Sequence, residues 1–261
     1  MSVESEDRSA AGFTGPRAMS RVLRLFSLLS AEPHGLSLAE LSEKLDSPKS
    51  TLLNSLRPLE VEGFLLSGEG RYRLGPRVFR LAAQITMTWS LPRLARPYLS
   101  ELAAATGETA TLSVLHGDRF LVIEAIETAN PVRYALVPGA SAPLHAGAAG
   151  RVLLAFQEEA VKENYLSHAK MQRYTEHTVV DPEVLRAQLA VVRRSKSWTA
   201  LGERNIDGAG IASPVFGPKG DIVAALGISL PAVRLRGREN ELREVVLKLA
   251  AAASGQDFGS E

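Results

Sequence analysis

The sequence contains no cysteine and no long apolar run. Without cysteine, disulfides, thiolate metal sites and cysteine nucleophiles are excluded, and a reducing compartment is favoured. No run of about 18 apolar residues occurs, so no membrane-spanning helix and no membrane partner are expected. Residues 1–15 are polar and acidic, without the basic start and apolar centre of a signal peptide. These absences predict a cytoplasmic protein.

Motifs for catalysis and cofactor binding are also missing. The sequence has no G-x-S-x-G, no H-E-x-x-H, no P-loop and no G-x-G-x-x-G. Ser141 and His145 are close in sequence, but no acid is identified that could orient the histidine as a catalytic base. The five histidines show no metal-ligand spacing. We therefore expect no enzyme activity, no cofactor and no metal.

The composition that remains is typical of a globular protein with two domains. Of its 261 residues, 45% are hydrophobic and 23% are charged, and domains average about 150 residues. Residues 16–90 hold ten Lys or Arg against seven acids, whereas residues 91–261 hold nineteen of each. Ordinary solvated surfaces also vary by this much, so the basic surplus is weak support for nucleic-acid binding.

Residues 17–62 have the periodicity of three helices. Apolar residues recur every three or four positions over 17–31, at Met19, Val22, Leu23, Phe26 and Leu29. Ser37 and Glu40 have the spacing of a capping box at the start of a second helix. A third helix is expected from Pro48 to about Glu62, where Pro58 either kinks it or shortens its regular part.

A short hairpin is expected after these helices. Residues 64–67 and 71–74 are strand-like, and Gly68, Glu69 and Gly70 form a three-residue loop between them. Three helices followed by a hairpin are typical of a winged helix-turn-helix. We therefore predict a disordered tail over 1–15 and a winged helix-turn-helix over 16–75.

The third helix has the composition of a DNA recognition helix. Its core leucines leave Ser50, Asn54 and Arg57 on one polar face, and Asn and Arg side chains can read adenine and guanine edges in the major groove. The alternative is that these are solvated surface groups. The predicted contacts to double-stranded DNA, including phosphate contacts from the first helix and the hairpin, are Arg17, Ser20, Arg21, Lys49, Ser50, Thr51, Asn54, Arg57, Arg71 and Arg73.

Residues 76–90 are expected to form a linker and dimerisation helix. Its stripe is too apolar to face water on a linker, so the same helix of a second subunit is the expected cover. The stripe comprises Val78, Leu81, Ala82, Ile85 and Trp89.

Residues 91–255 are predicted to form an α+β domain, because consecutive strand-like runs are flanked by helices. A mixed or antiparallel sheet is expected. The predicted strands are 109–115, 120–126, 132–137, 210–216 and 222–230, and the predicted helices are 91–106, 148–156, 182–194 and 238–253.

Four segments carry a family resemblance: GLSLAELSEKLDSPKSTLLNSL, GRYRLGPRVFRLA, APLHAGAAGRVLLAF and GAGIASPVFGPKGDIVAALGISLP. Together they resemble the isocitrate lyase regulator (IclR) family of bacterial transcription factors. The similarity extends over nearly the whole chain after residue 16. It implies a GAF-like sensor domain, a small organic effector and an operator bound by a homodimer or a dimer of dimers. Repression is the commoner outcome in this family and is expected here.

Departures from the family pattern bear on the effector. Gly210 stands where a cysteine is usual, and Gly227 replaces the first serine of an I-S-I-S strand. The cluster of acidic residues that is usual near residues 200–203 is reduced to Glu203. In relatives that bind small keto acids, these positions help to hold the ligand. The resemblance therefore implies a larger or more apolar effector, such as an aromatic carboxylic acid.

The helix that follows Gly147 also favours an anion, because the first N–H groups of a helix are unpaired. His145 could donate to that anion, or it could be a satisfied core histidine; Gly210 and Gly227 could equally mark close backbone packing. A sensor domain that no longer binds a ligand and serves only in oligomerisation is the alternative function. The predicted effector-binding residues are Leu144, His145, Ala146, Gly147, Ala200, Gly210, Ile211, Gly227 and Ser229.

Overall fold

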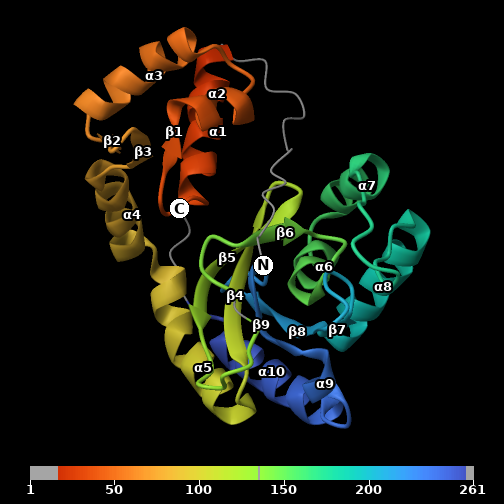
Figure 1. The fold of residues 1–261 in the computed structure, drawn as a ribbon. Coiled ribbons are helices and arrows are strands. Elements are labelled where there is room, and N and C mark those ends of the chain that lie inside the picture. Colours follow the sequence, from red (N-terminus) through yellow and green to blue (C-terminus); the bar gives the residue numbers. More distant parts are fainter. Residues whose placement is uncertain (1–16, 135, 257–261) are drawn as a thin grey trace. The chain divides into compact units, whose positions relative to one another are not determined.

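The computed structural model describes residues 17–134 and 136–256, so the predicted tail over 1–15 lies outside it. The chain divides into two compact units, with the boundary between Thr88 and Trp89. Figure 1 shows the elements of both units, and each unit is described by itself.

The N-terminal unit is a winged helix-turn-helix, as the sequence predicts. Its three strands form an antiparallel sheet in the order β1-β3-β2. The elements are α1 (Arg17–Ser30), β1 (Leu36–Ser37), α2 (Leu38–Lys44), α3 (Lys49–Val61), β2 (Leu65–Gly68), β3 (Arg71–Leu74) and α4 (Pro76–Thr88).

The capping box at the start of α2 is confirmed. The Glu40 backbone N–H donates to Ser37 Oγ at 3.3 Å, and the Ser37 N–H donates to Glu40 Oε2 at 2.7 Å. Hydrogen bonds from Ser37 lower the pKa of the Glu40 carboxyl, which remains charged. The two residues satisfy each other's polar groups and fix the point at which the helix begins.

The wing hairpin is tighter than predicted. Gly68 pairs with Arg71, so the loop contains two residues, not three. Glu69 and Gly70 both have positive φ angles, +54° and +75°. This backbone is that of a type I′ turn, whose twist matches the twist of paired strands.

The core of the N-terminal unit differs from the predicted stripe on α1. Met19 and Leu23 are each 54% exposed, whereas Leu25 is buried. The helix is therefore rotated from the predicted orientation, so that Leu25 and Leu29 face the core. Helix α3 continues through Pro58 to Val61. The buried residues of this core are Leu25, Leu29, Leu36, Leu41, Leu45, Leu52, Leu56 and Leu65.

The C-terminal unit contains a six-stranded sheet in the order β6-β5-β4-β9-β8-β7. Every neighbouring pair is antiparallel, so the mixed sheet does not occur in this unit. The elements are α5 (Ser90–Thr106), β4 (Thr109–His116), β5 (Arg119–Ile126), β6 (Ser141–Pro143), α6 (Ala148–Ala155), α7 (Glu159–His168), α8 (Pro182–Ser195), β7 (Trp198–Leu201), β8 (Gly208–Phe216), β9 (Ile222–Pro231), α9 (Ala232–Leu235) and α10 (Glu239–Ala253).

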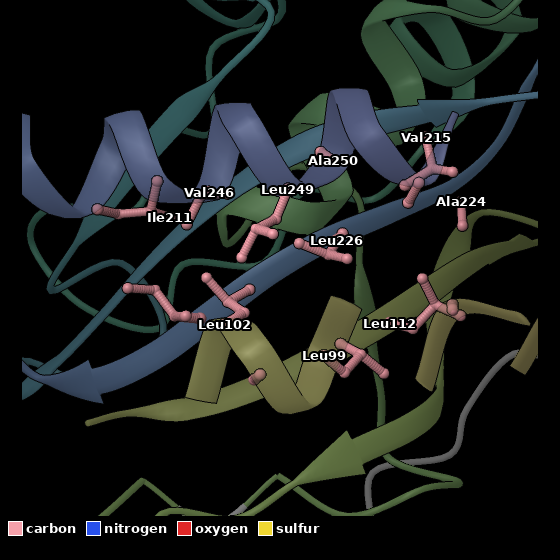
Figure 2. Close-up of a cluster of buried hydrophobic side chains, with 14 of the residues drawn as sticks. Leu99, Leu102, Leu112, Ile211, Val215, Ala224, Leu226, Val246, Leu249 and Ala250 are labelled. Carbon is pink, nitrogen blue, oxygen red and sulfur yellow. The ribbon is translucent and has the colours of Figure 1, made fainter. Parts of the chain in front are cut away.

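The two faces of this sheet are built from different side chains. One face packs against α5 and α10 through large aliphatic residues such as Leu112, Ile211 and Leu226 (Figure 2). The other face, which is covered by α6 with α8 beyond it, carries Ala, Gly, Ser and Thr at many positions. Side chains alternate between faces along a strand, so one face forms the main core and the other is lined by small residues.

One predicted strand is wrong, and several short elements were not predicted. Residues 132–134 and 136–137 form no strand, and both Val132 and Val137 are largely exposed. The apolar run has no neighbouring strand to pair with, because β6 occupies the edge of the sheet beside β5. Strands β6 and β7 contain three and four residues and carry little sequence signal. Among the described residues, no helix has both the length and the hydropathy that a transmembrane span requires.

Candidate DNA-binding surface and effector site

The outer face of α3 is polar, as predicted. Leu52 and Leu56 are fully buried beneath the helix, while Lys49, Ser50, Asn54 and Arg57 are exposed and Thr51 is half-buried. No side chain caps the start of the helix at Pro48. The N–H groups of its first turn therefore add partial positive charge beside Lys49.

The two wing arginines are not equivalent. Arg71 and Arg73 lie on the same exposed face of β3, but Arg71 Nη1 donates to the Gly35 carbonyl at 2.7 Å and lies 3.4 Å from Glu40 Oε2. Arg71 thus joins the wing to the start of α2. Arg73 passes beside Gly35, with no carboxylate of the described chain within ion-pair distance.

The predicted contacts on α1 are less exposed. Ser20 and Arg21 are both half-buried, and the Arg17 side chain lies outside the description. Lys49 and Arg57 resemble Arg73 in lacking an acidic partner within the described ranges, whereas Lys44 and Arg77 each have one. Among the described residues, the cations of the α3 and wing surface without an acidic partner are therefore Lys49, Arg57 and Arg73.

In the C-terminal unit, the start of α6 already holds an anion from the chain itself. The Gly147 N–H donates to Glu203 Oε2 at 2.9 Å, and Arg151 Nη1 forms a short, buried ion pair with the same oxygen. Arg151 Nε also donates to Gln188 Oε1 at 2.8 Å. Sequence reasoning predicted an anion at this helix end but did not identify Glu203, which lies 56 residues from Gly147.

His145 is buried, and both of its ring nitrogens have partners. Nδ1 lies 3.1 Å from the Tyr165 hydroxyl, and Nε2 lies 2.9 Å from the Gln172 carbonyl. The His145 backbone N–H also donates to Tyr165 Oη at 3.0 Å. This arrangement is that of a satisfied core histidine, and it leaves the ring no donor for an effector.

Three of the predicted effector residues lie in one row across the sheet. Ala200 pairs with Gly210, Gly210 pairs with Ser229, and Ser229 pairs with Thr109 on β4. A Cβ atom at Gly210 would lie 3.9 Å from Ala148 Cβ, so this row lies directly below the start of α6.

The remaining predicted residues have other surroundings. Ile211 faces α5 and α10, so grouping it with Gly210 was wrong, because adjacent residues of a strand point to opposite faces. A Cβ atom at Gly227 would lie 2.3 Å from the Ile211 carbonyl oxygen, which favours the close-packing interpretation of that glycine. Leu144 and Ala146 are fully buried below α6.

Four buried polar atoms on the α6 side of the sheet have no hydrogen-bond partner among the described residues. They are Thr109 Oγ1, Ser113 Oγ, Trp198 Nε1 and Arg151 Nη2. Buried donors normally have partners, and an unsatisfied one costs about 1–3 kcal/mol. The small-residue face between the sheet and α6 therefore offers donors to an oxygen-bearing molecule. The alternation of Thr109, Thr111 and Ser113 along β4 was the sequence signal for this face.

Family models match both units. The IclR helix-turn-helix domain matches residues 18–67, and the C-terminal domain of the bacterial transcriptional regulator IclR matches residues 84–255. The chain belongs to the IclR family. It is accordingly a transcription regulator with a DNA-binding helix-turn-helix and a C-terminal effector domain.

Relatives in the IclR family are similar over most of their length. The transcriptional regulator KdgR of Dickeya chrysanthemi is 33% identical over 91% of this chain and 79% of its own. The DNA-binding transcriptional repressor YiaJ of Escherichia coli is 30% identical over 94% of this chain and 89% of its own. An IclR homolog from Microbacterium hydrocarbonoxydans, solved in complex with 4-hydroxybenzoate, is 26% identical, with a TM-score of 0.80 over 91% of this chain and 97% of its own.

Proposed function

We propose that this IclR regulator is a repressor that binds a pseudo-palindromic operator as a homodimer or dimer of dimers. Its α3 and wing contact the DNA, and a small aromatic carboxylic acid in the C-terminal unit controls that binding. The cytoplasm is the proposed location, because the operator is chromosomal DNA. The name of the related repressor YiaJ supports repression.

The observation that carries the DNA-binding part of the proposal is the exposed face of α3. Buried leucines fix the helix from below, while Asn54 and Arg57 project from its exposed side. Lys49, Arg57 and Arg73 have no acidic partner among the residues described, so they remain available to phosphate or base oxygens. Arg71 is assigned a smaller role, because it already contacts Gly35 and Glu40.

The aromatic effector is supported by the small-residue face below α6. Small residues line the row at Ala200, Gly210 and Ser229, and the unpaired donors Thr109 Oγ1 and Trp198 Nε1 suit the oxygen atoms of a flat molecule. The related Microbacterium protein binds 4-hydroxybenzoate, which has this chemistry.

Pairing with a second copy of the chain is supported by the apolar residues of α4, the main part of the predicted linker over 76–90. Leu81 is 43% exposed and Ile85 is 58% exposed, and the two lie four residues apart on one side of the helix. Such a surface on one helix is typical of an interface. A two-fold pair would place two copies of α3 about 34–36 Å apart, or a multiple of that distance.

Three alanine substitutions test the DNA-binding surface in full-length protein on its own promoter fragment. Arg57→Ala and Arg73→Ala should weaken binding, and each lost phosphate contact should reduce the log–log salt slope by about 0.9. Asn54→Ala should cost about 1–3 kcal/mol on the operator and little on random DNA, because a base contact carries sequence information. Fluorescence anisotropy between about 50 and 200 mM salt, where affinity from phosphate contacts falls steeply, measures the affinity and the salt slope.

The arginine variants and the asparagine variant have separate contradicting outcomes. Unchanged affinity and slope for both arginine variants would reject the placement of the DNA-binding surface. Equal losses on operator and random DNA would make Asn54 a phosphate contact. Lys219→Ala, on an exposed turn of the C-terminal unit, is the control for the loss of a positive charge.

The alternative function is a DNA-binding oligomer whose C-terminal unit binds no ligand. It is favoured by one observation: Glu203 fills the anion position at α6, and the hydrogen bonds of His145 are already satisfied. Ligand-dependent unfolding separates the two functions. A true effector at 100 times its Kd should stabilise the protein by about 2.7 kcal/mol, whereas a unit without a ligand site gains nothing.

A further inference from the structure

The inner end of the candidate effector site is unsuited to a second carboxylate. Glu203 already accepts the Gly147 N–H and pairs with Arg151, so that the positive charge of the helix end and of Arg151 is neutralised there. A ligand carboxylate placed beside Glu203 would meet a like charge in a buried setting. The acid group of an effector therefore needs another cation.

Arg204, the next residue along the chain, is such a cation. Its guanidinium has neither a hydrogen bond nor an acidic partner among the described residues. It lies over the Tyr174 ring, 5.5 Å from the centroid. Tyr174 in turn stacks on His145, with ring centroids 6.3 Å apart. Arg204 thus stands at the outer end of an aromatic row that begins at the buried histidine.

The surroundings of Arg204 are cationic and aromatic. Arg204 is an exposed residue, although neighbouring groups partly desolvate its guanidinium and so lower its pKa, and the nearby charge of Arg119 lowers that pKa further. Arg119 donates to Ser141 Oγ at 3.0 Å and to the Ser141 carbonyl at 3.1 Å, and no carboxylate of the described residues pairs with it. An anion that approaches Arg204 and Arg119 would therefore meet two positive charges that no acid of the described chain is paired with.

The loop that carries Arg204 is held on both sides. Thr175 Oγ1 donates to the Gly202 carbonyl at 2.5 Å, and Thr178 Oγ1 donates to the Glu203 carbonyl at 2.6 Å. The Gly202 N–H donates to the Gly208 carbonyl at 2.8 Å. These bonds fix the backbone next to Arg204, and the contact of its guanidinium with the Tyr174 ring limits the positions of the side chain.

We infer that Arg204, with Arg119 beside it, binds the carboxylate of an aromatic acid effector at the outer end of the site, while the ring of the acid points toward α6. The inference rests on the proposed effector function and names the group that selects acids. A guanidinium binds a carboxylate through two parallel hydrogen bonds, which an ammonium or an amide cannot reproduce.

The test compares acids with neutral analogues. Titration calorimetry on full-length protein measures the Kd of benzoate and 4-hydroxybenzoate, and of benzamide and 4-hydroxybenzamide. Wild type should prefer the acids. Arg204→Gln should weaken acid binding by about tenfold to a hundredfold and leave amide binding within about twofold. The acid affinity of Arg204→Lys should lie between that of wild type and that of Arg204→Gln. Arg236→Gln, an exposed arginine of the same unit, should change nothing.

The outcomes separate the inference from the function on which it rests. If wild type prefers an acid and Arg204→Gln binds that acid equally well, the inference is overturned while the effector function stands. If wild type binds none of the acids, both the inference and the aromatic-acid effector fail. Unfolding followed by fluorescence of Trp89 and Trp198, both in the C-terminal unit, verifies that each variant is folded.

Discussion

His145 has hydrogen-bond partners that define its protonation. The Gln172 carbonyl can only accept, so Nε2 carries the proton, and Nδ1 accepts from the Tyr165 hydroxyl. The ring is therefore neutral. Burial is the main cause that lowers the pKa of His145 below its ordinary value, and burial likewise raises the pKa of Tyr165 to about 12.

The lowered pKa of His145 predicts that the C-terminal unit loses stability in weak acid. In the unfolded chain His145 takes up a proton near pH 6.5, its ordinary value, while the folded unit resists protonation. The unfolded state then binds more protons, so stability falls as pH drops below that value and is fully present above it. Urea midpoints from tryptophan fluorescence between pH 5 and 8 measure this loss.

His145→Gln should flatten that pH dependence, because it keeps a donor for the Gln172 carbonyl and removes the titrating ring. His116→Gln, at an exposed histidine, is the matched control and should retain the wild-type slope. A slope that survives in His145→Gln would assign the acid sensitivity to another group.

Contacts between neighbours in sequence were predictable at the residue scale, and distant contacts were not. Ser37 and Glu40 are three residues apart, so their capping box is visible as a pattern. The partner of Gly147 is 56 residues away, and nothing in the local sequence selects Glu203 over another acid. For the same reason, the anion at α6 was predicted as a ligand and is instead a side chain.

At the scale of elements, α6 shows why helix propensity alone does not predict the effect of a substitution on stability. A Cβ atom at Gly150 would lie 2.6 Å from the Leu144 carbonyl oxygen and 2.7 Å from Leu144 Cα. Both are backbone atoms, which cannot rotate away. The absence of a side chain at Gly150 therefore lets α6 pack on the segment that leads into it.

Gly150→Ala should destabilise the C-terminal unit despite the better helix propensity of alanine. Propensity favours alanine by about 1 kcal/mol, but a clash with fixed backbone costs about 1–3 kcal/mol or more. Gly210→Ala is the control, because its Cβ would lie 3.3 Å from the nearest backbone atom, so it should cost less. Thermal unfolding midpoints, followed by tryptophan fluorescence, measure the stability of both variants. A Gly150→Ala protein more stable than wild type would contradict the predicted clash.

Elements with strong periodicity were predicted well, and elements defined by their neighbours were not. The helices and the wing of the N-terminal unit have capping, turn and stripe signals within their own sequence. Strands β6 and β7 exist because β5 and β8 offer them an edge. The run over 132–137 has strand composition but no such edge. Met19 and Leu23 fit the helical period equally well and are exposed, because periodicity alone does not distinguish neighbouring stripes.

At the scale of the whole molecule, the account requires two copies joined through α4. Leu81→Asp with Ile85→Asp places two charges in the proposed interface and should weaken operator binding about a hundredfold, because paired DNA-binding units bind far more tightly than single ones. Acid binding by the C-terminal unit should persist. Light scattering and gel shifts measure assembly and DNA binding.

Gln84→Asp with Met87→Asp adds the same charge to α4 away from the stripe and is the control for that pair. If the Leu81 and Ile85 variant stays paired through its N-terminal units and binds the operator normally, the stripe has another role.

The central claim is that a small acid in the C-terminal unit changes the affinity of the N-terminal unit for DNA. The most direct measurement is operator binding by full-length protein, followed by fluorescence anisotropy at fixed salt, with and without a saturating aromatic acid that raises the unfolding temperature. Coupling between two sites typically amounts to about 1–3 kcal/mol, or roughly 5- to 150-fold in affinity. We predict a change of at least about fivefold; an operator affinity that is identical in both conditions, with the acid bound, would contradict the account.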